Sequence, residues 1–318
     1  MCGVPVPLIY KNNQTCIVKK GNGVKMNDKK IWIVTDSNSG ISIEEEEKYN
    51  VGIISMPFII DGKEFYENLT IDRPTFFDYL DKNVDVKTSQ PSIESLMNVF
   101  RSGLKENDEI IYIPMSSELS GSVMTARSVA GEFDGRVHVV DNHRISCTQK
   151  QSVLEAVALA KAGYSADEIC GILEEHMYDV SIYIAVDTLE YLKRGGRITK
   201  TAAAIGNVLD IKPVLQIQGG KLEAYKKSRG RKAAQRIMLE AVEKDIKERF
   251  AGREVLIKGA YCGDKQAADE WEEKIKNRFP DYDISLDPLA LSICCHIGPG
   301  ALAIVCMAKL QELNTRTL

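Results

Sequence analysis

Hydroxyl-rich segments stand next to several of the elements that the sequence predicts. The segment 36–40 (DSNSG) follows the apolar run 31–35, and 116–122 (SSELSGS) follows the apolar run 109–114. A third segment, 88–92 (TSQPS), leads into a predicted helix. Because ligands of open α/β sheets lie beyond the carboxyl ends of parallel strands, we expect these segments to converge at one edge. Hydroxyls and helix N-termini suit a carboxylate or phosphate oxygen, although Ser and Thr at such places also act as helix caps.

Ser120 is the candidate for a nucleophile in this cluster. Glu118 stands where the G-x-S-x-G elbow requires glycine. The candidate bases and orienting carboxylates are His143, His296, Asp141 and Asp36. Their order along the chain matches no hydrolase pattern, so a serine hydrolase acting on a lipid ester is kept as an alternative function. A nucleotide enzyme is not supported, because the sequence has no G-x-x-x-x-G-K-[ST] and no G-x-G-x-x-G after its first strand.

The elements that would position these residues alternate between strand and helix in the first half of the chain. The predicted strands are 31–35, 51–60, 109–114 and 137–141, and the predicted helices are 42–49, 74–81, 92–104, 122–133, 146–162 and 165–176. This alternation is typical of an α/β fold whose parallel sheet is covered on both faces. Asp61-Gly62 predicts a hairpin turn, which would add an antiparallel appendage to that sheet. Ser146 and Ser165 open their helices as expected N-caps.

The second half of the chain has a different pattern. A strand at 182–186 is followed by a helix at 199–209, a hairpin that turns at Gly219-Gly220, and a long helix at 231–250. A strand at 254–260 and a helix at 266–279 come next. Hairpins mixed with helices indicate a mixed α+β sheet. We therefore expect an N-terminal α/β domain at 26–180 and a C-terminal domain at 181–318, with the ligand between them. Residues 1–25 form an extension of unknown role.

Composition narrows the class of protein. The 318 residues include eight cysteines and carry a net charge of −4. No C-x-x-C occurs and no His lies at zinc spacing from a Cys pair, which predicts a reducing cytoplasm and no metal site. The stretch 288–308 is uncharged, but His296 and the Gly298-Pro299-Gly300 turn interrupt it. Two buried elements joined by a tight loop therefore explain it better than a transmembrane segment.

Six ordered motifs together resemble the DegV family of bacterial fatty-acid-binding proteins. They are Thr35-Asp36-Ser37, the 88–92 segment, the 116–122 segment, 187–198 (DTLEYLKRGGRI), 212–215 (KPVL) and 296–300 (HIGPG). Their order covers residues 30 to 310. Residues 1–25 carry none of these motifs.

The resemblance implies that a long-chain fatty acid such as palmitate lies in a tunnel between two α/β domains. The residues that would bind its carboxylate are Thr88 and Ser120. The supporting residues of the pocket would be Ser89, Ser117, Gly121, Ser122 and His296. Candidate tunnel-lining residues are Met56, Phe58, Met115 and Ile297. Apart from this ligand no cofactor is expected.

In some members of the family a separate, ATP-dependent fatty acid kinase phosphorylates the presented carboxylate. The protein itself would then be a lipid-binding subunit and not an enzyme, which agrees with the missing phosphate loop. Arg197 and Arg229 are the residues expected to meet the partner or the head group.

Basic residues concentrate in one part of the chain. Residues 193–236 contain twelve Lys and Arg against Asp210 and Glu223, a net charge of +10, so the remainder carries −14. Such a basic belt suits an acidic protein or acyl-phosphate head group, and the alternatives are an anionic membrane surface and a nucleic-acid-binding module. No DNA- or RNA-binding signature accompanies the belt, and aromatic residues make up only 7% of the chain, so we expect no nucleic acid partner.

Overall fold

The computed structural model describes residues 28–82, 84–199 and 211–315. The first of its sheets has four parallel strands. The strands are β1 (Ile31–Asp36), β2 (Val51–Ile54), β6 (Glu109–Ile113) and β7 (Val137–Val139), in the order β2-β1-β6-β7. Most of their side chains are buried on both faces, as expected when helices cover a parallel sheet. The predicted parallel sheet is therefore confirmed, and all four strands end at the same edge.

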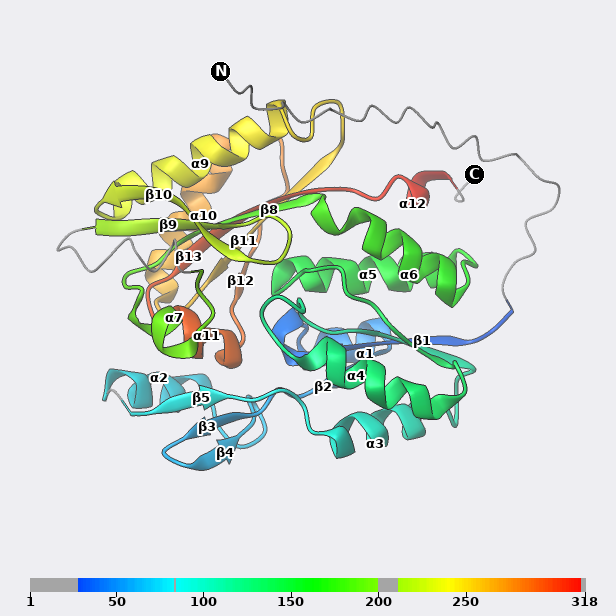
Figure 1. The fold of residues 1–318 in the computed structure, drawn as a ribbon. Coiled ribbons are helices and arrows are strands. Elements are labelled where there is room, and N and C mark those ends of the chain that lie inside the picture. The colour runs from blue at the N-terminus through cyan, green and yellow to red at the C-terminus, as the bar shows by residue number, and fades with distance from the viewer. Residues whose placement is uncertain (1–27, 83, 200–210, 316–318) are drawn as a thin grey trace, which may run out of the picture.

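Helices pack on both faces of this sheet (Figure 1). They are α1 (Ile43–Tyr49), α3 (Ile93–Gly103), α4 (Ser122–Ala130), α5 (Cys147–Lys161) and α6 (Ala166–Glu175), with short 3-10 turns at Ser37–Ser39, Gly131–Phe133 and His176–Tyr178. Alternate residues of β1 point to opposite sides, so Ile33 packs on α5 and α6 while Val34 packs on α3 and α4. The two apolar layers fix the sheet edge against which the hydroxyl-rich loops lie.

The single strand expected at 51–60 is wrong. The chain breaks at Ser55-Met56-Pro57, where proline supplies no N–H to a ladder and the Met56 N–H donates to Ser37 Oγ (3.0 Å). The second half becomes β3 (Phe58–Ile60), which pairs with β4 (Lys63–Phe65) and β5 (Val86–Thr88). The predicted Asp61-Gly62 turn is present, but its hairpin belongs to this separate three-stranded sheet and not to the parallel one. Helix α2 (Arg73–Asp81) connects β4 and β5.

A six-stranded mixed sheet forms from the second half of the chain. Its order is β10-β9-β8-β13-β11-β12, with β8 (Val180–Ala185), β9 (Ile211–Ile217), β10 (Leu222–Arg229), β11 (Val255–Tyr261), β12 (Leu286–Pro288) and β13 (Leu302–Ala308). Helices α9 (Arg231–Lys247) and α10 (Lys265–Arg278) cover one face. The other face packs against the small sheet, α2, α7 (Glu190–Gly195) and α11 (Leu291–Ile297), as Figure 1 shows.

The α/β class with a parallel and a mixed sheet is thus confirmed, and the uncharged stretch near 300 forms α11 and the buried strand β13. The expected domain boundary coincides with the start of β8 and stays a prediction. After β13 the chain returns to the first sheet, where Leu310 joins its core and α12 (Glu312–Thr315) contacts α5. Residues 1–25 and nearly all of the expected helix 199–209 lie outside the described residues.

Within the residues that the structure describes, no helix is both long enough and apolar enough to cross a membrane.

Candidate functional site

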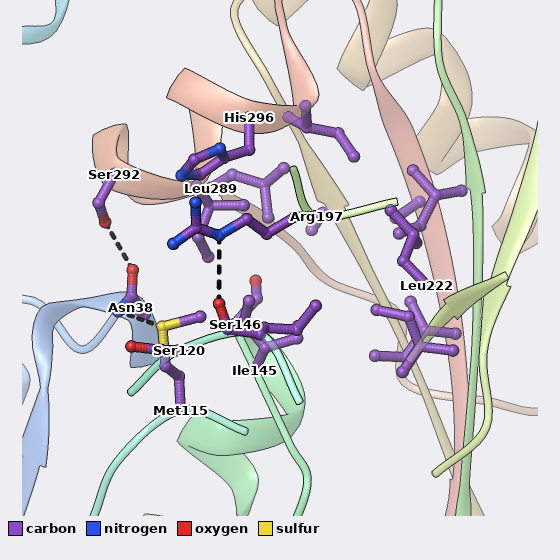
Figure 2. A pocket seen from close by; sticks show the side chains of 18 of the residues that line it. Asn38, Met115, Ser120, Ile145, Ser146, Arg197, Leu222, Leu289, Ser292 and His296 are labelled. Atoms are coloured by element: carbon purple, nitrogen blue, oxygen red, sulfur yellow. Dashed lines mark hydrogen bonds between the residues drawn. The ribbon is translucent and has the colours of Figure 1, made fainter. Parts of the chain in front are cut away.

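A cavity of about 340 Å³ lies between the carboxyl edge of the parallel sheet and the inner face of the mixed sheet. The loops after β1, β6 and β7 form one wall, and β8, β13 and α11 form the opposite wall (Figure 2). The volume is within the range of about 300–1,000 Å³ typical of small-molecule sites. The sheet edge predicted from the hydroxyl-rich segments therefore borders a cavity.

The lining of the cavity is chemically uneven. Its apolar part is aliphatic, with no Phe, Tyr or Trp among the described lining residues; it includes Ile145, Ile182, Ile184, Ile217, Leu222, Leu289, Ile297 and Val305. The polar lining residues are Asn38, Thr88, Ser89, Gln90, Ser120, Ser146, Ser292 and His296, together with one charged residue, Arg197. A long aliphatic surface with one cation suits a flexible apolar chain that ends in a single negative charge.

Thr88 and His296 meet at the polar part of the cavity. Thr88 is the last residue of β5 and pairs with Phe58 of β3, while His296 lies in the last turn of α11. Their side chains are joined by a hydrogen bond of 2.7 Å between Oγ1 and Nε2. The other end of α11 is fixed to the same region, because the Glu67 carboxylate accepts a hydrogen bond from the Leu291 N–H (2.7 Å). The small sheet and the loop after it thus hold α11 at both ends.

The surroundings of His296 determine its charge and which of its two ring nitrogens carries the proton. Burial, together with the positive charge of Arg197, lowers the pKa of His296 to about 4, so the ring is neutral near pH 7. Its Nδ1 is buried without a hydrogen-bond partner, and an N–H there would be costly. We therefore assign the proton to Nε2, so that Nε2 donates to Thr88 Oγ1 and the Thr88 hydroxyl hydrogen is free for a ligand. A Cβ on Gly195 would lie 2.1 Å from Nδ1, so only glycine permits this ring position.

The hydroxyl oxygen of Ser120, like that of Thr88, has a hydrogen-bond partner within the protein. The Ser122 N–H donates to Ser120 Oγ (3.2 Å), and the two hydroxyls are 2.8 Å apart. Helix α4 begins after Gly121, which provides no side-chain cap. Gly121 is needed for packing, since its Cβ would lie 2.4 Å from Gln90 Oε1. Because the Ser120 oxygen accepts the Ser122 N–H, the Ser120 hydroxyl can point its own hydrogen into the cavity.

Asp36 connects the loop after β1 to the loop after β6 and to helix α5. Its buried carboxylate accepts hydrogen bonds from the Met115 N–H (2.9 Å), the Asn38 N–H (3.0 Å) and Gln149 Nε2 (3.1 Å). Burial raises the pKa of Asp36, although these donors oppose the shift. The Asn38 side chain in turn accepts from Ser292 Oγ (2.5 Å) and so connects the loop after β1 to α11. Asp36 is therefore a positioning residue of the cavity wall.

The predicted site residues do not all reach the cavity. Those that line it are Thr88, Ser89, Ser120, Gly121, His296 and Arg197, together with Met56, Met115 and Ile297. Ser122 is buried behind Ser120, and the Ser117 N–H donates to the Asp141 carboxylate (3.2 Å). Phe58 packs in the hydrophobic core beside the cavity and does not line it. Arg229 is exposed at the end of β10.

Four polar lining residues are not among the predicted site residues: Asn38, Gln90, Ser146 and Ser292. Asn38 and Gln90 lie inside the hydroxyl-rich segments, so proximity to those motifs is the available signal. Ser146 is predicted to cap α5, but its side chain makes no cap hydrogen bond and lines the cavity instead. No signal in the sequence places Ser292 there, because its contact with Asn38 spans 254 residues.

Fold and site together define an α/β protein that encloses an aliphatic cavity with a hydroxyl-rich end. The family model of DegV, described as an uncharacterised protein family, matches residues 30–309. The chain therefore belongs to the DegV family. A DegV domain-containing protein of Staphylococcus aureus is 31% identical, with 87% of this chain and 98% of that protein covered. One from Clostridium acetobutylicum is 32% identical, with 90% and 99% covered.

Solved structures of the family have the same fold. A fatty-acid-binding DegV protein of Thermus thermophilus superposes with a TM-score of 0.81 at 30% identity, covering 88% of this chain and all of that one. DegV of Bacillus subtilis, a fatty acid binding protein, gives 0.79 at 28% identity with the same coverage. A stearic-acid-binding protein of Eubacterium ventriosum gives 0.79 at 26% identity and covers 89% and 99% of the two chains.

Proposed function

We propose that this protein binds a long-chain fatty acid in the cavity, with the carboxylate at Thr88 and Ser120. The observation that carries the proposal is that each hydroxyl oxygen already has a second hydrogen-bond partner, His296 Nε2 for Thr88 (2.7 Å), to which we assign the ring proton, and the Ser122 N–H for Ser120 (3.2 Å). Each hydroxyl is thereby free to donate, and a carboxylate offers one oxygen to each. Ser89, Gly121 and Arg197 complete this end of the cavity.

The aliphatic walls supply most of the affinity in this proposal. Each buried CH₂ contributes about 0.8 kcal/mol, so a C16 chain such as palmitate gains on the order of 10 kcal/mol before losses. The hydroxyls then need only to satisfy the head group and set its position. Walls without Phe, Tyr or Trp in their described part favour this ligand over a base or a ring that would stack.

Native mass spectrometry of the purified protein tests the proposal. We expect an adduct with the mass of a C16 or C18 fatty acid that is released on denaturation. Protein that carries no such adduct and does not take up added hexadecanoic acid would rule the function out. A serine hydrolase is less well supported, because Ser120 Oγ bonds to Ser122 while His296 bonds to Thr88. Ester turnover that disappears in Ser120→Ala would favour the hydrolase instead.

The second part of the proposal is that the bound acid is presented to a separate ATP-dependent fatty acid kinase. Arg197 is exposed at the hydroxyl end of the cavity and donates to the Leu119 carbonyl. Arg229 lies two residues before Arg231, whose guanidinium pairs with Asp187 ahead of α7 (3.2 Å). Arg197 at the cavity and Arg229, which is exposed at the end of β10, are the two cations that would meet an acidic partner surface.

The charge-reversal variant Arg229→Glu separates the two parts of the proposal. We expect phosphorylation of the bound acid by a kinase partner to slow while lipid content is unchanged. Arg101→Glu is the matched control, since it reverses another exposed arginine, on α3 of the parallel-sheet layer. Loss of lipid from Arg229→Glu would show that Arg229 acts on the ligand and not on a partner.

A further inference from the structure

The chain passes between the two large sheets at two neighbouring places (Figure 1). It leaves the parallel-sheet layer after α6, through the turn His176–Tyr178, and enters β8 at Val180. It returns after β13, where Leu310 joins the core of the first sheet and α12 contacts α5. The two passages are bonded to each other, because the Ala308 N–H donates to the Asp179 carbonyl (3.0 Å). Since the cavity lies between these sheets, a hinge that opens it would lie at the paired passages.

One histidine bonds to a carboxylate in each passage. His176 Nδ1 lies 2.5 Å from an oxygen of Asp179 in the first passage, and Nε2 lies 3.3 Å from an oxygen of Glu312 in the second. An ionised carboxylate only accepts hydrogen bonds, so both ring nitrogens have to donate. We therefore assign a proton to each nitrogen, which makes the ring an imidazolium. His176 thus joins the end of α6 to α12 through its positive charge.

Other charged groups hold the first passage independently of His176. The Asp179 carboxylate is also bound by Arg253, whose two terminal nitrogens each lie 2.6 Å from one of its oxygens. Arg144, which is paired with Glu155, donates to the His176 carbonyl (3.1 Å). The charged side chains that surround the ring and its turn are Asp179, Glu312, Arg253, Arg144, Glu155 and Arg249.

A rise in pH removes one of the two bonds of the ring. Burial by itself would lower the pKa of His176, but the hydrogen bonds to Asp179 and Glu312 outweigh it and raise the pKa above its ordinary value. The bridge is therefore complete below about pH 6.5, the pKa of an unfolded chain, and is lost as the pH rises through the pKa in the folded protein. A neutral ring has one N–H, which we expect on Nδ1 at the shorter contact. Nε2 then turns a lone pair to the Glu312 carboxylate.

The contact that is lost is the one in the second passage, which leads directly to the cavity wall. Strand β13 runs from Ala303 and Val305, which line the cavity, to α12. Strand β8 is hydrogen-bonded to β13 and supplies Ile182 and Ile184 to the same wall. A loosened α12 therefore gives this wall more freedom to move against the loops of the parallel sheet.

We propose that His176 is a pH-sensitive latch at a hinge between the two large sheets. With the ring charged, α12 is held against the end of α6 and the two sheets stay together around the ligand. When the ring loses a proton, the second passage loosens, the sheets part more readily, and the fatty acid exchanges faster. This inference rests on the proposed fatty-acid function and adds a control of ligand exchange to it.

Stopped-flow dissociation of cis-parinaric acid, a fluorescent C18 fatty acid, into an excess of hexadecanoic acid measures the exchange rate between about pH 6 and pH 9. We expect the rate constant to rise about ten-fold across this range, the effect of losing one hydrogen bond to a charged group. In His176→Gln the side chain is neutral at every pH, so the rate constant should be high and independent of pH. Glu312→Gln, which alters the other end of the same contact, should behave in the same way.

His138→Gln is the matched control. His138 on β7 likewise lies between two carboxylates, Glu109 (3.8 Å) and Asp167 (3.3 Å), but both belong to the parallel-sheet layer. Its replacement should leave the pH dependence of the dissociation rate as it is in the unaltered protein. An equal pH dependence in the unaltered protein and in His176→Gln would show that another group controls exchange, and the inference would be wrong.

Hydrogen exchange of the C-terminal peptide that contains α12, corrected for the intrinsic pH dependence of amide exchange, is a readout that needs no lipid. We expect exchange to become faster as His176 loses its proton, and to be fast at every pH in His176→Gln. If this exchange follows the pH while the dissociation rate stays constant, His176 is only a structural contact and the latch is wrong. If cis-parinaric acid does not bind while the peptide still responds to pH, the proposed fatty-acid function fails, and the control of exchange fails with it.

Discussion

The Thr88 hydroxyl and the His296 imidazole form a hydrogen bond of 2.7 Å between residues that are 208 positions apart. One belongs to the small sheet and the other to α11, so the bond joins two parts of the fold at the polar end of the cavity. With His296 neutral and its proton on Nε2, the bond sets the direction in which Thr88 donates. A contact of this kind positions a ligand without placing a second charge beside Arg197.

Removing both hydroxyls of the carboxylate site should abolish lipid retention. Each hydrogen bond to a charged group contributes about 1.5–3 kcal/mol, so Thr88→Val with Ser120→Ala should weaken fatty-acid binding at least about a hundred-fold. Displacement of a fluorescent fatty acid measures the affinity, and circular dichroism checks the fold. Ser128→Ala, an exposed serine on α4, is the matched control. Full lipid occupancy in the double variant would show that the carboxylate binds elsewhere.

Displacing the histidine ring should weaken binding without touching a hydroxyl. In Gly195→Ala the new Cβ would lie 2.1 Å from His296 Nδ1, so the ring must move away from Thr88. We expect about a ten-fold loss of fatty-acid affinity, measured by the same displacement assay. Gly171→Ala on α6 meets no neighbour within 4 Å and should leave affinity unchanged while stabilising the helix slightly. Equal affinity in the two variants would separate His296 from ligand binding.

The lowered pKa of His296 predicts how stability depends on pH. The pKa is about 4 in the folded protein and about 6.5 in an unfolded chain, so the unfolded chain binds the proton first as the pH falls. The contribution of neutral His296 is complete above about pH 6.5 and is lost as the pH falls toward about 4. Urea unfolding across this range should show a steeper loss in the native protein than in His296→Gln. Parallel pH curves for the two proteins would contradict the assignment.

Replacing Asp36 should lower the stability of the protein and should also change the shape of the cavity. In Asp36→Asn an amide N–H would face donors that now bond to the carboxylate, among them the Met115 N–H. We expect a loss of about 2–4 kcal/mol in the free energy of unfolding, measured by urea titration. Fatty-acid affinity should also fall, because Asn38 and Met115 line the cavity. Unchanged stability would mean that the loops hold their positions without this carboxylate.

The sequence alone determined the alternation of strands and helices, the parallel first sheet, and the two hydroxyl-rich segments 36–40 and 116–122 at its edge. These features depend on local periodicity and on the shared direction of parallel strands, which short windows of sequence record. The resemblance to the DegV family added the ligand class, which residue types alone left open between a carboxylate and a phosphate.

Only the tertiary structure decided which hydroxyls face the cavity and what holds them there. Ser92 caps its helix as its sequence position predicts, whereas Ser146 does not cap α5 and lines the cavity. The break at Pro57, which creates a separate sheet for Thr88, and the Asn38–Ser292 contact likewise depend on distant parts of the chain. Local pattern cannot show such pairings, because they are set by how the two sheets pack and not by the neighbours of each residue in sequence.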